Sequence, residues 1–148
     1  MDELEISSPL YLVTSSEPCW KCSESQKVIA IAAFAIKDEF ETLGGDGEMH
    51  FVINIEEMPQ EIYEYIATIN PHYKKHYSHT AEITYYSNTC SCGANFGDFY
   101  LYSEPDGAFF PQSAEIASTI TAQLLPFNGQ FKFIGGYGSV PGNIKIAV

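Results

Sequence analysis

Positive charge is scarce in this chain. Its 148 residues include 7 Lys+Arg against 19 Asp+Glu, which gives a formal net charge of −12 at pH 7. Because lysine and arginine supply most of a protein's affinity for phosphate, this balance argues against direct nucleic-acid binding and against anionic membrane surfaces. A basic protein partner, by contrast, would be attracted over long range.

Long apolar segments are absent as well. The longest apolar run, at residues 28–36, is shorter than the ~20 residues that a membrane-spanning helix needs. Residues 1–5 are acidic where an export signal would be basic. We therefore expect a cytoplasmic protein in a reducing environment, where cysteines hold metal more often than they form disulfides. The length, with 45% hydrophobic residues, predicts a single domain over residues 1–148.

Cysteines are few, yet their spacing is the most informative pattern in the sequence. The four form two tight pairs, Cys19 with Cys22 and Cys90 with Cys92. Two pairs from two chain segments supply the ligands of one tetrahedral thiolate site, which Zn²⁺ binds tightly. We predict a structural Zn²⁺ held by all four cysteines.

The surroundings of the cysteines fit such a site. Backbone N–H groups in a cysteine turn hydrogen-bond to sulfur, and Lys21 and Lys27 would offset the negative charge of the centre. The second pair has one intervening residue where two are usual, and Gly93 is expected to help the chain kink. The alternative is that His79 or another histidine replaces one cysteine ligand.

Catalytic interpretations compete with the structural one. A thioredoxin-like CxxC needs its first cysteine at a helix N-terminus, and it would leave the second cysteine pair unexplained. A catalytic zinc keeps an open position, which four cysteines close. The segment with His72, His76 and His79 lacks the glutamate of an HExxH motif and is predicted to be a surface loop. Residues 135–142 are rich in glycine but lack the lysine of a phosphate-binding loop, so we predict a flexible hairpin turn.

The hydrophobic pattern predicts an α+β fold, in which a zinc-ribbon-like four-cysteine site clamps an antiparallel sheet with one or two packed helices. One helix is expected to begin at Pro59 and to continue to Ile69, and a second to cover residues 113–125 with Ser113 as N-cap. The run at 27–36 fits a helix or a strand, and the neighbouring metal knuckle favours a strand. Further strands are predicted at residues 10–14, 50–55, 80–86, 97–102, 131–134 and 143–148.

The cysteine segments resemble those of a group of uncharacterised bacterial proteins with paired-cysteine zinc-binding knuckles. In that group a Cys-Trp-x-Cys knuckle precedes a strand, and a segment Tyr-x-Asn-x-Cys-x-x-Cys-Gly-x-x-x-Gly-Asp-Phe-x-Leu follows. This chain has Cys19-Trp-Lys-Cys22 and, later, Tyr86-Ser-Asn-Thr-Cys-Ser-Cys-Gly-Ala-Asn-Phe-Gly-Asp-Phe-Tyr-Leu101. The resemblance spans residues 10 to 111 and implies a zinc site without an established activity. The shorter second spacing departs from the pattern and bears on the fourth ligand.

Together these patterns favour a non-enzymatic, zinc-binding interaction module. Tyrosine and phenylalanine crowd residues 63–110, and an exposed subset beside acidic residues would make a protein-binding face. The most concrete form is an acidic inhibitor or immunity-type protein that neutralises a basic partner such as a toxin or nuclease. The alternative is a thiol-redox or hydrolytic enzyme that uses the cysteine or histidine clusters.

Overall fold

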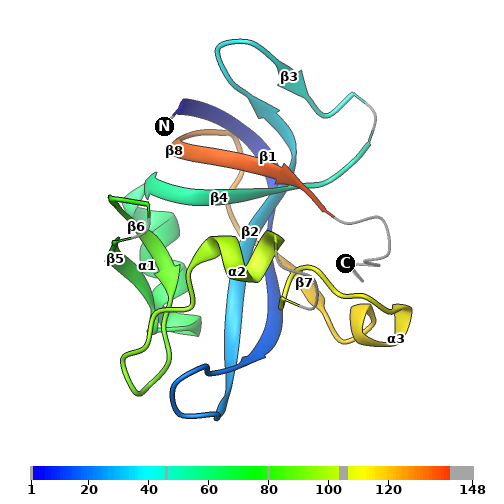
Figure 1. Cartoon of the computed structure of the whole chain (residues 1–148). Coiled ribbons are helices and arrows are strands. Elements are labelled where there is room, and N and C mark those ends of the chain that lie inside the picture. The colour runs from blue at the N-terminus through cyan, green and yellow to red at the C-terminus, as the bar shows by residue number, and fades with distance from the viewer. Residues whose placement is uncertain (1, 46, 80, 104–106, 141–148) are drawn as a thin grey trace.

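The computed structural model describes residues 2–45, 47–79, 81–103 and 107–140 (Figure 1). Its elements are β1 (Asp2–Pro18), β2 (Ser25–Lys37), β3 (Thr42–Leu43), β4 (His50–Glu57), α1 (Gln60–Ile69), β5 (Tyr73–Ser78), β6 (Ile83–Asn88), α2 (Asp98–Ser103), α3 (Ala114–Ala117), β7 (Thr121–Leu124) and β8 (Gln130–Ser139). No helix in these ranges is both long and apolar enough to cross a membrane.

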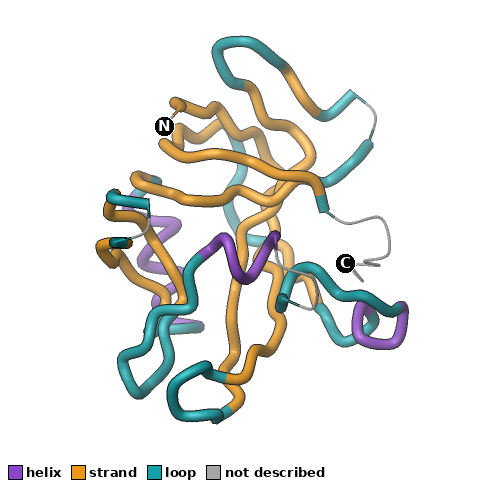
Figure 2. Tube along the Cα trace, in the orientation of Figure 1, coloured by secondary structure: helices purple, strands orange, loops and turns teal. Residues whose placement is uncertain are grey.

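Four antiparallel strands close into a barrel. β1 pairs with β2, β2 with β4, β4 with β8, and β8 returns to β1. Strands β3 and β7 extend the sheet at β2 and β1, while β5 and β6 form a separate two-stranded sheet. Strand dominates the chain trace, with short helices around it (Figure 2). The predicted α+β fold is therefore wrong: the protein is mainly β, and its sheet closes on itself.

Strand β1 pairs with β2 along one edge, and with β8 and then β7 along the other. The register of β1 with β2 shifts between Ser7 and Leu10. Proline has no N–H to donate to a ladder and is tolerated in strands at such irregularities. Residues 2–7 pair with β8, and residues 11–14 pair with β7. One long strand thus closes the barrel and continues beyond it.

Strand β2 is buried on both faces, which explains why its sequence does not alternate. Ile29 and Ile31 face the barrel core. Val28 and Ala30 lie in a second core outside the barrel, together with Phe51 of β4. A strand between two cores reads as a continuous apolar run. The strand predicted at 27–36 is confirmed.

The predicted helix after Pro59 is confirmed as α1, whose Ile62 and Ile66 are buried in the barrel core. The segment at 97–102, predicted as a strand, is instead the helix α2. It follows Gly97, which has a φ of 61° and so turns the chain sharply before Asp98.

The helix predicted at 113–125 is also wrong. The Oγ of Ser113 accepts the N–H of Ile116 at 3.2 Å, as expected of an N-cap. The helix ends after one turn, however, and the chain continues as β7, which pairs with β1. Pairing with a strand more than a hundred residues away outweighs the local helical pattern.

The predicted glycine-rich turn is likewise wrong for the described residues up to 139, because β8 runs through it. A Cβ on Gly135 would lie 2.9 Å from the carbonyl oxygen of Ile53. The glycine is therefore required by the close approach of β4, where Asn54 adopts a φ of 49° within an irregular pairing. The strand predicted at 143–148 lies outside the described residues.

Candidate metal centre

The first cysteine pair occupies the turn between β1 and β2. The N–H of Cys19 donates to the carbonyl of Glu24 at 2.8 Å, and the N–H of Ser23 donates to the carbonyl of Cys19 at 2.9 Å. The N–H of Lys21 lies 3.4 Å from the Sγ of Cys19, which is the turn-to-sulfur hydrogen bond that the sequence predicts. The turn buries Cys19 and leaves Cys22 exposed.

The second pair lies in a turn that follows β6. The N–H of Cys90 donates to the carbonyl of Ala94 at 2.8 Å, and the N–H of Gly93 donates to the carbonyl of Cys90 at 2.9 Å. Gly93 has a φ of 95°, which glycine adopts readily, so the predicted kink is present. This turn buries Cys90 and leaves Cys92 exposed. It therefore presents its cysteines as the first turn does, despite the shorter spacing.

Asn88 places the second turn beside the first. Its side-chain Oδ1 accepts the N–H of Ile29, and its Nδ2 donates to the carbonyl of Ile29, both at 2.9 Å. Asn70 adds a bond of 3.1 Å from its Nδ2 to the carbonyl of Lys27. These amides satisfy backbone groups of β2 that β4 does not reach, because β4 pairs only with residues 31–33.

Trp20 joins the two turns directly. Its Nε1 donates to the carbonyl of Asn95 at 3.0 Å, and the side chain is otherwise 70% exposed. Neither this role of Trp20 nor the docking role of Asn88 could be predicted from the sequence, because both depend on residues that are distant in the chain.

The four thiols converge in the arrangement that a tetrahedral metal site requires. The Sγ atoms of Cys19 and Cys92 are 3.7 Å apart, and those of Cys22 and Cys90 are 3.5 Å apart. All four Sγ atoms lie within 4.8 Å of one another. Ligands 2.3 Å from a central Zn²⁺ would be about 3.8 Å apart. The cluster is compatible with metal binding, and all four cysteines are free thiols.

Hydrogen bonds from the backbone and from neighbouring sulfurs give the thiols different pKa values. The N–H of Cys22 first, and that of Lys21 as well, lower the pKa of Cys19 from 9.0 to about 7. A backbone hydrogen bond from Glu24 lowers the pKa of Cys22, but the Cys90 sulfur and the other thiols outweigh it and raise that pKa to about 12. A negative charge on one sulfur thus holds protons on its neighbours, an effect that a bound cation reverses.

The histidines do not join the cluster. Among the described residues, the four cysteines are the one group of three or more side chains placed to hold a metal ion. His76 lies in β5 instead of the predicted loop, and His79 contacts the ring of Tyr77 at 5.0 Å. A histidine ligand in place of a cysteine therefore has no support from the geometry.

Asp98, the first residue of α2, is a buried carboxyl. Its Oδ2 accepts the N–H of Asn54 at 2.7 Å, which links α2 to the irregular part of β4. Its own N–H donates to the hydroxyl of Tyr85 at 3.2 Å. Burial raises the pKa of Asp98 to about 7, although the bond from Asn54 opposes the shift.

A second notable feature is the acidic tip, residues 38–41, which links β2 to β3. One carboxylate oxygen of Asp38 accepts the N–H groups of Phe40 and Glu41 at 2.8 and 2.7 Å. The Tyr137 hydroxyl lies 2.8 Å from both the Asp38 and the Glu41 carboxylates. Hydrogen bonds from the N–H groups of Glu41 and Phe40, and then from Tyr137, lower the pKa of Asp38. The turn is thereby fixed, while the Phe40 side chain is 82% exposed.

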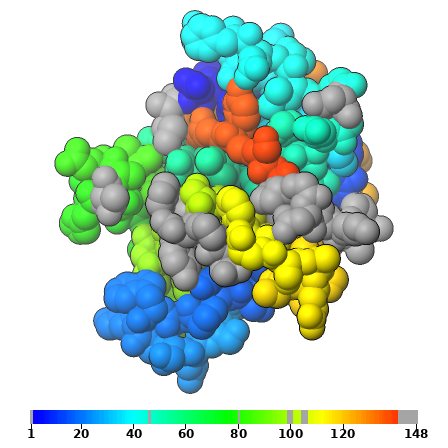
Figure 3. All heavy atoms as spheres, turned by 45° about the vertical axis from the view of Figure 1, so that its right-hand side comes forward, coloured from blue at the N-terminus to red at the C-terminus, as the bar shows by residue number. Residues whose placement is uncertain are grey.

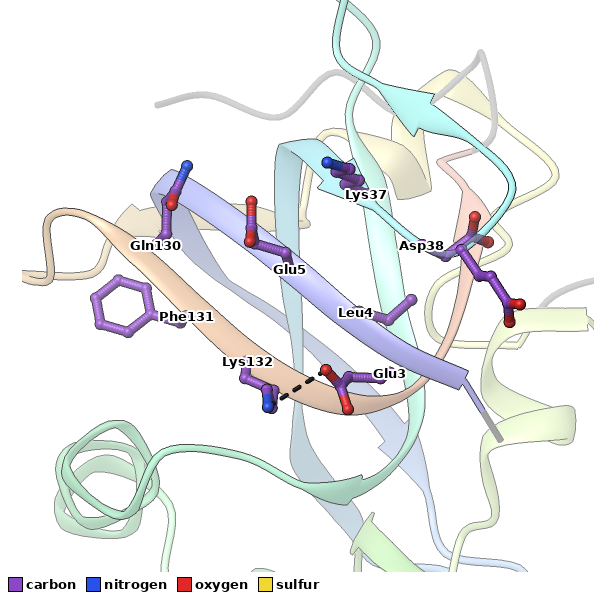
Figure 4. A pocket seen from close by; sticks show the side chains of 9 residues that line it. Glu3, Leu4, Glu5, Lys37, Asp38, Gln130, Phe131 and Lys132 are labelled. Atoms are coloured by element: carbon purple, nitrogen blue, oxygen red, sulfur yellow. Dashed lines mark ion pairs between the residues drawn. The ribbon is translucent and has the colours of Figure 1, made fainter.

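A hollow of about 470 Å³ lies beside the acidic tip (Figure 4). It is lined by Glu3, Leu4, Glu5, Lys37, Asp38, Glu39, Gln130, Phe131 and Lys132. Lys132 pairs with Glu3 at 3.3 Å across β8 and β1. With four carboxylates and two lysines, the lining keeps an excess of negative charge.

Comparisons of the chain with protein-family models, with curated proteins and with solved structures found no match.

Proposed function

We propose that this protein is a zinc-stapled binding protein that recognises a basic protein partner and catalyses no reaction. The zinc is structural: Cys19, Cys22, Cys90 and Cys92 hold it and join the β1–β2 turn to the turn after β6. The most specific form of the proposal is an inhibitor or immunity-type protein, whose carboxylates occupy sites on the partner that otherwise bind phosphate.

The sulfur arrangement is the observation that supports zinc. Four thiolates match the preference of Zn²⁺ for soft ligands in a tetrahedron, and the contacts of 3.5 and 3.7 Å lie near the expected ligand spacing. Four protein ligands leave no position open for a substrate, so the geometry favours a structural role over catalysis. Bound Zn²⁺ would supply cross-linking of two chain segments and neutralisation of their thiolates.

Metal analysis tests the site. We expect one zinc per chain in protein purified without added metal, with four thiols that react with a thiol reagent only after chelation. Trp20, the one tryptophan in the chain, reports on the site, because its indole bonds to Asn95 of the second turn. Chelation should therefore change its fluorescence. Metal-free protein with thiols that react without a chelator would overturn the zinc assignment.

The acidic tip is the observation that supports a basic partner. Between Lys37 and Lys74 the sequence has nine acidic residues and no lysine or arginine. Within this stretch, Phe40 projects from a turn that hydrogen bonds hold in place. An exposed aromatic side chain on a fixed backbone loses little entropy on binding and is typical of an interface hot spot. The tip lies at the opposite end of the molecule from the cysteine turns, so binding there leaves the metal site free (Figure 3).

Selection from a displayed library of random short peptides tests this surface with a defined probe. We expect enrichment of peptides rich in lysine and arginine, whose binding weakens as salt is raised. Phe40→Ala and Glu39→Lys should each lower the affinity at least tenfold. Glu115→Lys makes the same charge change on exposed α3 and should lower it far less. Peptides without basic residues, or equal binding by all variants, would overturn the proposal.

A further inference from the structure

The short sulfur contacts each join one exposed and one buried cysteine, and both cross between the two turns. Exposed Cys22 contacts buried Cys90 at 3.5 Å, and exposed Cys92 contacts buried Cys19 at 3.7 Å. Cys19 and Cys90 are 3% and 2% exposed, so solvent reaches one sulfur of each contact far more readily than the other.

We propose that the cysteine cluster is an oxidation site for hydrogen peroxide, at which two disulfides between the turns, Cys22–Cys90 and Cys19–Cys92, replace the bound metal. The inference rests on the proposed zinc site. It adds a reaction of the cluster with a small oxidant to the structural role of the metal.

The chemistry follows from exposure. The bound cation keeps all four sulfurs as thiolates. Peroxide oxidises an exposed one, Cys22 or Cys92, to a sulfenic acid: the sulfur gains an oxygen atom, the O–O bond breaks and hydroxide leaves. The buried sulfur of the same contact then attacks the sulfenic sulfur, which forms the S–S bond and releases the oxygen as hydroxide or water. Each disulfide consumes one peroxide and two thiolates. Two disulfides consume all four ligands, so Zn²⁺ is released.

The sulfur contacts of 3.5 and 3.7 Å both cross between the turns. A disulfide needs an S–S distance of about 2.05 Å, so each contact must shorten by about 1.5 Å. Rotation of the exposed side chains of Cys22 and Cys92 can supply much of this change.

The product keeps the two turns together. The β1–β2 turn and the turn after β6 exchange a metal bridge for covalent bonds, so oxidation should release metal without releasing the turns. Chelation under reducing conditions removes the bridge and leaves nothing covalent in its place. Oxidised protein should therefore resist thermal unfolding better than reduced, metal-free protein.

The test uses the wild-type, zinc-loaded chain. Peroxide is added, zinc release is followed with a chromogenic chelator, and the product is digested with trypsin without reduction. Cleavage after Lys21 and Lys27 separates Cys19 from Cys22, while Cys90 and Cys92 share the fragment 76–132. We expect one zinc released per chain and a single species in which fragments 1–21, 22–27 and 76–132 are joined. Dithiothreitol and zinc should restore the starting protein.

Two other products would overturn the inference. One is fragment 1–21 joined to 22–27, with 76–132 closed on itself, because it shows disulfides within each turn. The other is zinc release with irreversible sulfinic acids and no disulfide. Protein that carries no zinc before oxidation would contradict the proposed metal site, and the fragment map would still show whether the disulfides lie within the turns or between them.

A matched pair of double variants separates the two possible pairings between turns. Cys22→Ser with Cys90→Ser keeps the contact of Cys19 with Cys92, whereas Cys22→Ser with Cys92→Ser keeps the two buried cysteines. Both variants lose two ligands, so they share any loss of metal. The first should form its disulfide at least tenfold faster with peroxide, and equal rates would overturn the proposed pairing.

Discussion

Replacing Asp98 with asparagine removes a titratable carboxyl from the interior and keeps an oxygen that accepts the N–H of Asn54. Asp98 is 6% exposed, and burial raises its pKa from 3.8 to about 7. The phenols of Tyr73, Tyr85 and Tyr102 surround it, and burial together with the charge of Asp98 raises the pKa of each. The carboxyl is therefore most stable in its neutral form.

The raised pKa of Asp98 determines how its contribution to the unfolding free energy changes with pH. Because the pKa of Asp98 is higher in the folded protein, its contribution to stability is complete below about pH 4 and is lost as the pH rises to about 7. A pKa unit corresponds to 1.36 kcal/mol, so the whole loss is about 4 kcal/mol. Asp98→Asn should escape this loss. The difference in unfolding free energy between variant and wild type should then move by about 3 kcal/mol in favour of the variant between about pH 5 and pH 8.

Urea unfolding of both proteins, purified in the same way, across this pH range measures that difference. Any metal bound to the cysteines would also make stability depend on pH, but it would contribute equally to both proteins and cancel. Glu39→Gln serves as a control, because it removes an exposed carboxyl of the acidic tip in the same way. Parallel pH profiles for wild type and Asp98→Asn would refute the assignment of a raised pKa to Asp98.

Two further substitutions test the contacts that position the site and close the barrel. Asn88→Ala should lower the unfolding free energy by about 2–4 kcal/mol, because the N–H and C=O of Ile29 both lose their partner; an unchanged urea midpoint would contradict this docking role. Gly135→Ala should cost about 1–3 kcal/mol, since its Cβ would lie 2.9 Å from the Ile53 carbonyl oxygen. Gly136→Ala, whose Cβ would meet the Ile53 side chain at 3.7 Å, should cost much less, and equal losses would show that crowding is not the cause.

The elements that the sequence predicts well are those whose pattern is local. In α1, apolar residues recur at helical spacing after Pro59, and its Ile62 and Ile66 are buried as that spacing requires. The segments predicted badly depend on a distant partner. β7 forms because β1 supplies the hydrogen bonds of its ladder, and β8 stays extended through Gly135 because β4 lies against it. The helical pattern before β7 and the glycines of β8 indicate what each segment would do in isolation. They do not indicate what it does once it pairs with another strand.

For the candidate site, residue type and spacing were enough to identify the four cysteines as one group. The ability to bind metal belongs to the cysteine side chain itself, and the two cysteines of each pair are only two or three positions apart. Both the residue type and the spacing can therefore be read from the linear sequence. Only the tertiary structure decided barrel closure, the docking of Asn88 on β2, the hydrogen bond from Trp20 to the second cysteine turn and the burial of Asp98. Each of these joins residues from distant segments. Their energies depend on which backbone groups remain unpaired once the strands have met, and a linear sequence does not record that.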